Sequence, residues 1–129
     1  RLRGTRLGIA VGEFRGGDVP RYRLDFARIL NRAVQFASDD PSRVIVVSIP
    51  DYGVTPFGRR RAAVGERIDR FNETAREAAV SRGARWVDVT TVSRQMPDAV
   101  VADGLHPSAE QYSAWVGLVA DVANAAKAR

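Results

Sequence analysis

One short segment constrains the fold of this chain more than any other: Val44-Ile45-Val46-Val47-Ser48-Ile49, which is almost wholly apolar and β-branched. A strand that exposes one face to water alternates apolar and polar residues, whereas a continuous apolar run is typical of a strand covered on both faces. Strands of that kind belong mainly to parallel sheets, whose neighbouring strands are joined by crossover helices. The run therefore predicts an α/β fold.

The rest of the chain supplies the strands and helices that this fold needs. Residues 7–11 and 85–89 are shorter apolar segments, and we expect them to form two further strands. Residues 19–37, 60–82 and 108–127 carry apolar side chains at spacings of three and four, which predicts helices with one buried face. The expected inward residues are Tyr22, Phe26, Ile29, Leu30, Ala33 and Phe36, then Val64, Ile68, Phe71, Ala75 and Ala78, then Tyr112, Trp115, Val116, Val119, Val122 and Ala123.

Residues at the helix ends support these boundaries. Asp18 is a plausible N-cap for the first helix, Gly83 fits the end of the second, and Ser108 with Gln111 matches a capping box for the third. Residues 90–107 are expected to form a loop. The order of strands and helices predicts a three-layer α/β/α domain in which ligands bind at the carboxyl ends of the strands.

Length and composition narrow the class of protein. With 129 residues, 45% of them apolar and 27% charged, the chain is expected to be one soluble domain without a membrane span. The net charge is +5, but its densest cluster, Arg59-Arg60-Arg61, is interpreted as the solvated start of the second helix. No nucleic-acid partner is expected, because no recognition module accompanies the charge.

The numbers of cysteine and histidine residues argue against two kinds of site. No cysteine is present and there is one histidine, so neither a disulfide framework nor a metal site is predicted. The first residues lack the pattern of a signal peptide, which favours a cytoplasmic location as an expectation.

The single histidine lies three residues after a carboxylate, in Asp103-Gly104-Leu105-His106. A histidine oriented by a carboxylate can take a proton from a nucleophile, so we interpret His106 as a general base and Asp103 as the group that orients it. A purely structural histidine is the alternative.

Polar residues also follow the other two predicted strands, and these loops are expected to share one rim of the sheet. Candidate substrate-binding residues there are Gly12, Glu13 and Arg15 after the first strand, and Asp51 and Tyr52 after the second. A role of Asp51 in stabilising its own turn is the alternative. Ser48, Ser93 and Ser108 are further candidates for a nucleophile, but a buried strand position is favoured for Ser48, a loop position for Ser93 and a helix cap for Ser108.

Three segments carry a resemblance to a known family. The block Asp-Gly-Leu-His-Pro-Ser at residues 103–108, followed by a helix with Tyr112, resembles the C-terminal block of the SGNH hydrolases, the GDSL-type esterase and lipase superfamily. Residues 46–57 are similar to a strand and loop of one bacterial branch, and residues 14–37 to the segment after the family's third block. The resemblance implies a flavodoxin-like α/β/α fold and ester hydrolysis without a cofactor.

The resemblance also implies a catalytic triad of serine, histidine and aspartate, in which His106 and Asp103 are two members. In the family the nucleophile stands in a Gly-Asp-Ser block, which does not occur in this sequence. Val11 or Gly12 stands where the family has an asparagine that donates to the oxyanion. Loss of one such donor typically lowers the rate about a hundredfold to a thousandfold.

These departures lead to two expectations of function. The first is an SGNH-type serine ester hydrolase that acts on a small acyl or lipid ester, in a single SGNH-like domain that is N-terminally incomplete. The alternative is a degenerate binding domain of the same fold. With a neighbouring strand absent, residues 7–11 would also form an exposed apolar edge, which predicts self-association or a partner at that edge.

Overall fold

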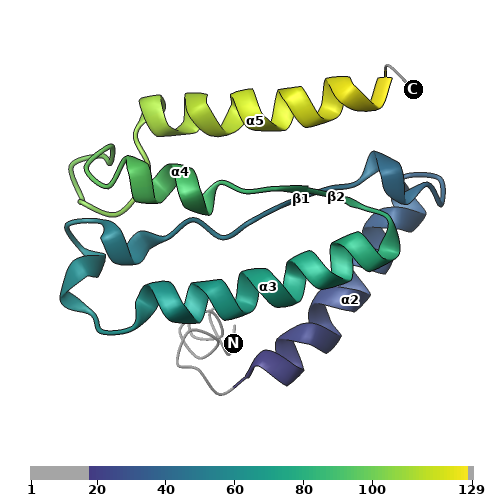
Figure 1. The fold of residues 1–129 in the computed structure, drawn as a ribbon, viewed down its shortest axis with the longest axis horizontal. Helices are drawn as coiled ribbons and strands as arrows, with labels where there is room; N and C mark the ends of the chain where they lie inside the picture. The colour runs from purple at the N-terminus through teal and green to yellow at the C-terminus, as the bar shows by residue number, and fades with distance from the viewer. Residues whose placement is uncertain (1–17, 128–129) are drawn as a thin grey trace, which may run out of the picture.

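A computed structural model describes residues 18–127 of the chain (Figure 1). The predicted strand at residues 7–11, with Gly12, Glu13 and Arg15 after it, lies outside the described residues. Among residues 18–127, no helix is both long and apolar enough to cross a membrane. The elements, in chain order, are α2 (Val19–Phe36), η1 (Pro41–Arg43), β1 (Ile45–Val47), η2 (Tyr52–Val54), η3 (Gly58–Arg60), α3 (Val64–Arg82), β2 (Arg85–Val87), α4 (Thr90–Gln95) and α5 (Ala109–Lys127).

The strands β1 and β2 pair in parallel, with Ile45 opposite Arg85 and Val47 opposite Val87. The helix α3 connects them, as a parallel pair requires. The helices α2 and α3 lie on one side of the strands and α5 lies on the other (Figure 1). This arrangement confirms the α/β fold with a parallel sheet between helical layers.

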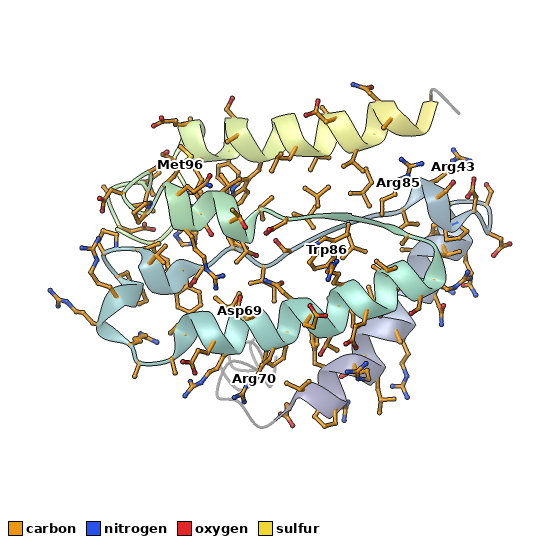
Figure 2. The ribbon with its side chains drawn as sticks, in the orientation of Figure 1. Arg43, Asp69, Arg70, Arg85, Trp86 and Met96 are labelled. Atoms are coloured by element: carbon orange, nitrogen blue, oxygen red, sulfur yellow. The ribbon has the colours of Figure 1, made fainter. Side chains whose placement is uncertain are left out.

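The core between the strands and the two helices is built from both. Leu30 of α2, Ala79 of α3 and Ala84 are buried together, and Trp86 of β2 packs against them. Trp86 lies on the side of β2 that faces α3 (Figure 2). On the opposite side of β2, the guanidinium of Arg85 donates a hydrogen bond of 3.0 Å to the carbonyl oxygen of Val122 in α5.

The ends of α2 and α3 follow from local chemistry. Asp18 occupies the N-cap position of α2, but its side chain makes no capping hydrogen bond; Pro20 stands in the first turn. Gly83 ends α3 with a positive φ of 88°. The N–H of Ala84 then reaches back to the carbonyl oxygen of Ala79 at 2.9 Å, which satisfies an otherwise unpaired carbonyl at the helix end.

The start of α3 differs from the prediction. The helix begins at Val64, and the arginine cluster lies before it: Arg59 and Arg60 in η3, and Arg61 just after η3. Ala63 has a φ of 58°, in the left-handed region, so the backbone cannot continue a right-handed helix through it. The arginines therefore belong to the loop that follows β1, rather than to the helix.

The segment 90–107 is also not a simple loop. Thr90–Gln95 forms the helix α4, which the sequence analysis missed. Inside α4, the hydroxyl of Ser93 donates to the carbonyl oxygen of Thr90 at 2.7 Å and accepts from the N–H of Asp51 at 2.8 Å. The helix is thus held by contacts with a distant loop, which local sequence patterns do not reveal.

Several side chains expected to point inward are exposed in the part of the chain that the structure describes. The exposed fractions are 67% for Ile29, 80% for Phe36, 49% for Tyr112 and 65% for Val116. Val47 of β1 is 44% exposed, so the strand is not covered on both faces by residues 18–127. The apolar faces of α2 and α5 therefore extend beyond the parts that other described residues cover.

The start of α5 is capped only in part as predicted. The N–H of Gln111 points to the Ser108 hydroxyl oxygen at 3.5 Å. The Gln111 side chain does not return to Ser108; its amide donates to the carbonyl oxygens of Met96 and Ala99, each at 3.1 Å. Gln111 therefore ties the segment after α4 to the first turn of α5.

Candidate functional site

The candidate site is a tight loop between α4 and α5, at the end of the molecule to which the carboxyl ends of β1 and β2 point (Figure 1). The loop is closed by hydrogen bonds from the N–H of Val101 to the oxygen of His106, at 2.8 Å, and from the N–H of Gly104 to the oxygen of Val101, at 2.9 Å. Gly104 has a φ of 70°, a conformation that favours glycine. The turn thereby brings residues 103 and 106 together.

Both carboxylate oxygens of Asp103 are occupied within this turn. One oxygen accepts the backbone N–H groups of Leu105 and His106, each at 2.9 Å. The other lies 2.5 Å from the Nδ1 atom of His106. With the carboxylate charged, Nδ1 is the protonated ring nitrogen, which leaves Nε2 as a proton acceptor.

Electrostatics keep Asp103 in the charged form. The hydrogen bond with the His106 side chain, followed by the backbone N–H groups of His106 and Leu105, lowers the pKa of Asp103 from 3.8 to about 2. The carboxylate therefore remains available to orient the ring throughout the neutral range. The side chains of His106 and Asp103 are 68% and 46% exposed, so the pair is accessible from solvent.

The structure places Asp51 differently from Asp103. Its carboxylate is 4% exposed; one oxygen accepts the N–H of Gly53 at 2.8 Å and the other pairs with Arg94 at 2.9 Å. The bonds from Asp51 and then Asp69 raise the pKa of Arg94 above its usual value, although burial opposes the shift. This geometry matches the turn-stabilising role; contact of Asp51 with substrate stays a prediction.

Tyr52, the other candidate in this loop, is half-buried in η2. Its carbonyl oxygen accepts the hydroxyl of Thr55 at 2.7 Å. Its backbone is also approached closely by Gly58, where an added Cβ would stand 1.7 Å from the same oxygen. The loop after β1 is therefore folded tightly upon itself, and a role of Tyr52 with substrate stays a prediction.

The hydroxyls of the serine just after β1 and of the serine within α4 are both hydrogen-bonded to other parts of the fold. Ser48 is buried, as predicted, and its oxygen accepts the N–H groups of Val89 and Thr90 at 2.9 and 3.0 Å. Ser93 is buried as well, bonded to Thr90 and Asp51. Neither hydroxyl is placed as a nucleophile, because each holds backbone groups of the core.

Sequence reasoning missed Asn72, whose amide connects α3 to both strand ends. Its side-chain oxygen accepts the N–H of Ile49 at 2.8 Å, and its nitrogen donates to Ile49 and Thr90 at 3.1 and 2.9 Å. An asparagine on the inward face of a helix, between apolar neighbours, is the signal that would have found it. Asn72 thus positions the two segments that follow β1 and β2.

Two grooves lie near the carboxyl ends of the strands. The first, about 460 Å³, has Asp103 in its wall and is lined by Pro56, Phe57, Arg60, Arg61, Ala102, Asp103 and Gly104. The second, about 560 Å³, runs between α3 and the end of β2 and is lined by Ser48, Asp69, Asn72, Glu73, Arg76, Trp86, Asp88, Thr90, Thr91 and Arg94. The arginine cluster that the sequence analysis treated as a solvated surface contributes to the first groove.

Asp88, in the second groove, is a hydrogen-bonded carboxylate of a different kind. Partial burial raises its pKa, but donors led by the hydroxyl and N–H of Thr91 outweigh this effect and lower the pKa below its usual value. One of its oxygens lies 2.6 Å from the Thr91 hydroxyl. Asp88 thus accepts hydrogen bonds from Thr91 in the first turn of α4 and is not paired with a histidine.

Comparison with known proteins supports a family assignment. A family model described as GDSL-like Lipase/Acylhydrolase family matches residues 13–114. The matched range contains both Asp103 and His106, together with β1, β2 and the loops that follow them. No curated protein and no solved structure matches the chain.

Proposed function

This chain belongs to the GDSL-like lipase/acylhydrolase family, and we propose that it takes part in hydrolysis of a small acyl or lipid ester through the pair Asp103 and His106. The observation that carries the proposal is the contact of 2.5 Å between the His106 ring and a carboxylate that is also fixed by two backbone N–H groups. A histidine held in this way is suited to general base catalysis.

In the proposed reaction, a serine hydroxyl oxygen bonds to the ester carbonyl carbon while Nε2 of His106 takes the hydroxyl proton. The bond from the carbonyl carbon to the leaving alcohol then breaks, and His106 returns the proton to the alcohol oxygen. Water repeats both steps on the acyl-enzyme and releases the acid. Asp103 holds the imidazole in the required tautomer and stabilises its protonated form.

We place the base, His106, and the carboxylate that orients it, Asp103, in this chain. That the nucleophile is a serine is taken from the resemblance. The Gly-Asp-Ser block that carries the serine in relatives does not occur in the 129 residues. Ser48 and Ser93 do not replace it, since their hydroxyls hold backbone groups. The position of the family's oxyanion asparagine is taken by Val11 or Gly12, whose side chains cannot donate, and both lie outside the described residues.

The test is hydrolysis of p-nitrophenyl acetate by the full chain beside the variants His106→Ala and Asp103→Asn. We expect hydrolysis that is slow, because the Gly-Asp-Ser block and one oxyanion donor are missing from the sequence, its loss in His106→Ala, and a lower kcat for Asp103→Asn. Glu110→Gln is the control, because Glu110 is exposed in the first turn of α5 and makes no ion pair among the described residues.

A second readout identifies the nucleophile. A fluorophosphonate probe followed by peptide mapping would show which serine is labelled in the full chain. Equal rates in the full chain and His106→Ala would contradict the proposal and favour the non-catalytic binding domain. Labelling of Ser48 or Ser93 would contradict the assignment of those hydroxyls to the core.

A further inference from the structure

The groove beside Asp103 combines an aromatic ring with two cationic side chains. We call it the arginine groove; it is lined by Pro56, Phe57, Arg60, Arg61, Ala102, Asp103 and Gly104. It is joined to the candidate catalytic pair through Asp103, which contributes to its wall and also holds His106. A substrate group in this groove would therefore lie next to the proposed reaction centre.

The three consecutive arginines are not equivalent. Arg59 is paired with Asp98 at 3.0 Å, so its charge is already matched. Arg60 and Arg61, in contrast, make no ion pair with any residue of the described part of the chain. The guanidinium of Arg61 lies over the ring of Phe57, 4.8 Å from its centre, which orients the cation and leaves its N–H edge for another partner.

The wall of the groove is fixed relative to the catalytic turn. The N–H of Phe57 donates to the carbonyl oxygen of Gly104 at 3.0 Å. An added Cβ on Gly104 would stand 3.3 Å from Pro56, so the two loops are in close contact. The arginines that follow Phe57 are thereby carried on a segment bonded directly to the turn that holds Asp103 and His106.

The negative charge of Asp103 does not neutralise the positive charge of the arginine groove. Both of its oxygens are directed at donors of its own turn, namely the His106 ring and the N–H groups of Leu105 and His106. The groove is thus lined by two arginines without an ion pair among the described residues and by one carboxylate that is already hydrogen-bonded. The groove favours an anionic ligand, and guanidinium groups bind carboxylate and phosphate oxygens by paired hydrogen bonds.

We propose that the arginine groove binds the anionic group of the substrate, so that the preferred substrates are esters that carry a carboxylate or phosphate near the scissile bond. Arg60 and Arg61 bind the anion, and Phe57 with Pro56 contacts the apolar part of the same molecule. This inference rests on the proposed function for its catalytic meaning, but the binding of an anion can be measured without catalysis.

The kinetic test compares two esters of similar length in the full chain. Mono-p-nitrophenyl glutarate carries a carboxylate, and p-nitrophenyl butyrate is neutral. We expect a higher kcat/KM for the glutarate ester, and a loss of about tenfold to a hundredfold in this preference in the double variant Arg60→Gln/Arg61→Gln. Arg59→Gln is the matched control and should keep the preference, because Arg59 is already paired with Asp98.

The binding test uses glutarate and inorganic phosphate as separate probes and records the amide NMR signals of the full chain. Shifts at Phe57 and Gly104 that saturate with probe, and that disappear in the double variant but persist in Arg59→Gln, support the proposal. A stronger response to one probe identifies carboxylate or phosphate as the favoured group. Binding should weaken as salt concentration rises.

The two tests separate the failure of this inference from the failure of the proposed function. Saturable binding of glutarate or phosphate without any ester hydrolysis would support the anion site and contradict the hydrolase. Hydrolysis that depends on His106, with no preference for the anionic ester and no shift at Phe57 or Gly104, would overturn the anion site alone.

Discussion

Asp103 shows how one side chain can organise a turn and a candidate base at the same time. Its carboxylate satisfies two backbone N–H groups and the Nδ1 atom of His106. These donors lower its pKa to about 2, so the folded turn favours the charged carboxylate. The associated stability is present above the unfolded pKa of 3.8 and is lost as the pH falls from about 4 through 2.

We expect His106→Ala to raise the pKa of Asp103, because the side chain of His106 makes the largest contribution that lowers it. The N–H groups of residues 105 and 106 remain in the variant, so the pKa should stay below 3.8. The side-chain carboxyl ¹³C signal of Asp103, followed against pH, measures both values. An identical midpoint in the full chain and the variant would show that the ring does not interact with the carboxylate in solution.

The sequence could predict this pair because its members are three residues apart in one turn. It could not predict Asn72, Ser93 or the pairing of Arg94, whose partners are far away in the chain. Asn72 bonds to Ile49 and Thr90, and Arg94 bonds to Asp51 and Asp69. Such contacts depend on the packing of α3 and α4 around the strand ends, and no local pattern encodes that packing.

Among the elements, α4 is tied to other parts of the fold by the ion pairs of Arg94 and by the hydrogen bond between Ser93 and Asp51. Arg94 joins α4 to the buried Asp51 after β1 and to the exposed Asp69 of α3. The Thr-Thr-Val-Ser sequence that opens α4 has a weak intrinsic preference for helix. This weak preference is the physical reason that α4 could not be predicted from the sequence.

A pair of double-mutant cycles tests which bond of Arg94 stabilises the fold. We expect a coupling free energy of about 1–3 kcal/mol between Asp51 and Arg94, because the Asp51 carboxylate is 4% exposed. Between Asp69 and Arg94 we expect about 0–1 kcal/mol, since the Asp69 side chain is 55% exposed. Urea unfolding of the alanine variants gives both values, and equal couplings would mean that burial of Asp51 has no energetic effect.

The three long helices and the strand cores were predicted because apolar periodicity reports them directly. The residues at which these elements begin and end depend on individual backbone angles. How much of each apolar face is buried depends on what packs against it. Ala63, with its left-handed φ, moves the start of α3 to Val64. Ile29 and Val116 lie outside the surfaces that residues 18–127 cover. The apolar pattern identifies a helix but does not show how much of its apolar face is buried.

At the scale of the whole molecule, the sheet formed by residues 18–127 has two strands, and each strand has one edge that no described strand pairs with. Val47 of β1 is 44% exposed, and apolar side chains of α2 and α5 are exposed on either side of the strands. Open strand edges next to apolar surface favour pairing with another chain. The association with itself or with a partner that was expected at residues 7–11 stays a prediction, and we extend it as a proposal to the β1 edge.

The variant Val47→Lys should reduce self-association, because a lysine on an edge strand disfavours strand pairing between chains. Size-exclusion chromatography with light scattering, over a range of protein concentrations, gives the apparent mass. Val80→Lys is the control: Val80 is 60% exposed on α3, away from the strands. A mass that stays monomeric at all concentrations, or falls equally in both variants, would contradict a role for the β1 edge.

The parallel pairing of β1 and β2 also affects how the chain folds. Ser48 and Asp88, at the ends of the two strands, are 40 residues apart in sequence, and closing a flexible loop of that length costs about 3 kcal/mol. Formation of α3 shortens the gap before the strands meet, and Gly83 then turns the chain toward β2. We therefore expect the rate of folding to be set by the docking of this helix, so that the paired strands, the turn with His106 and the arginine groove become ordered late and together.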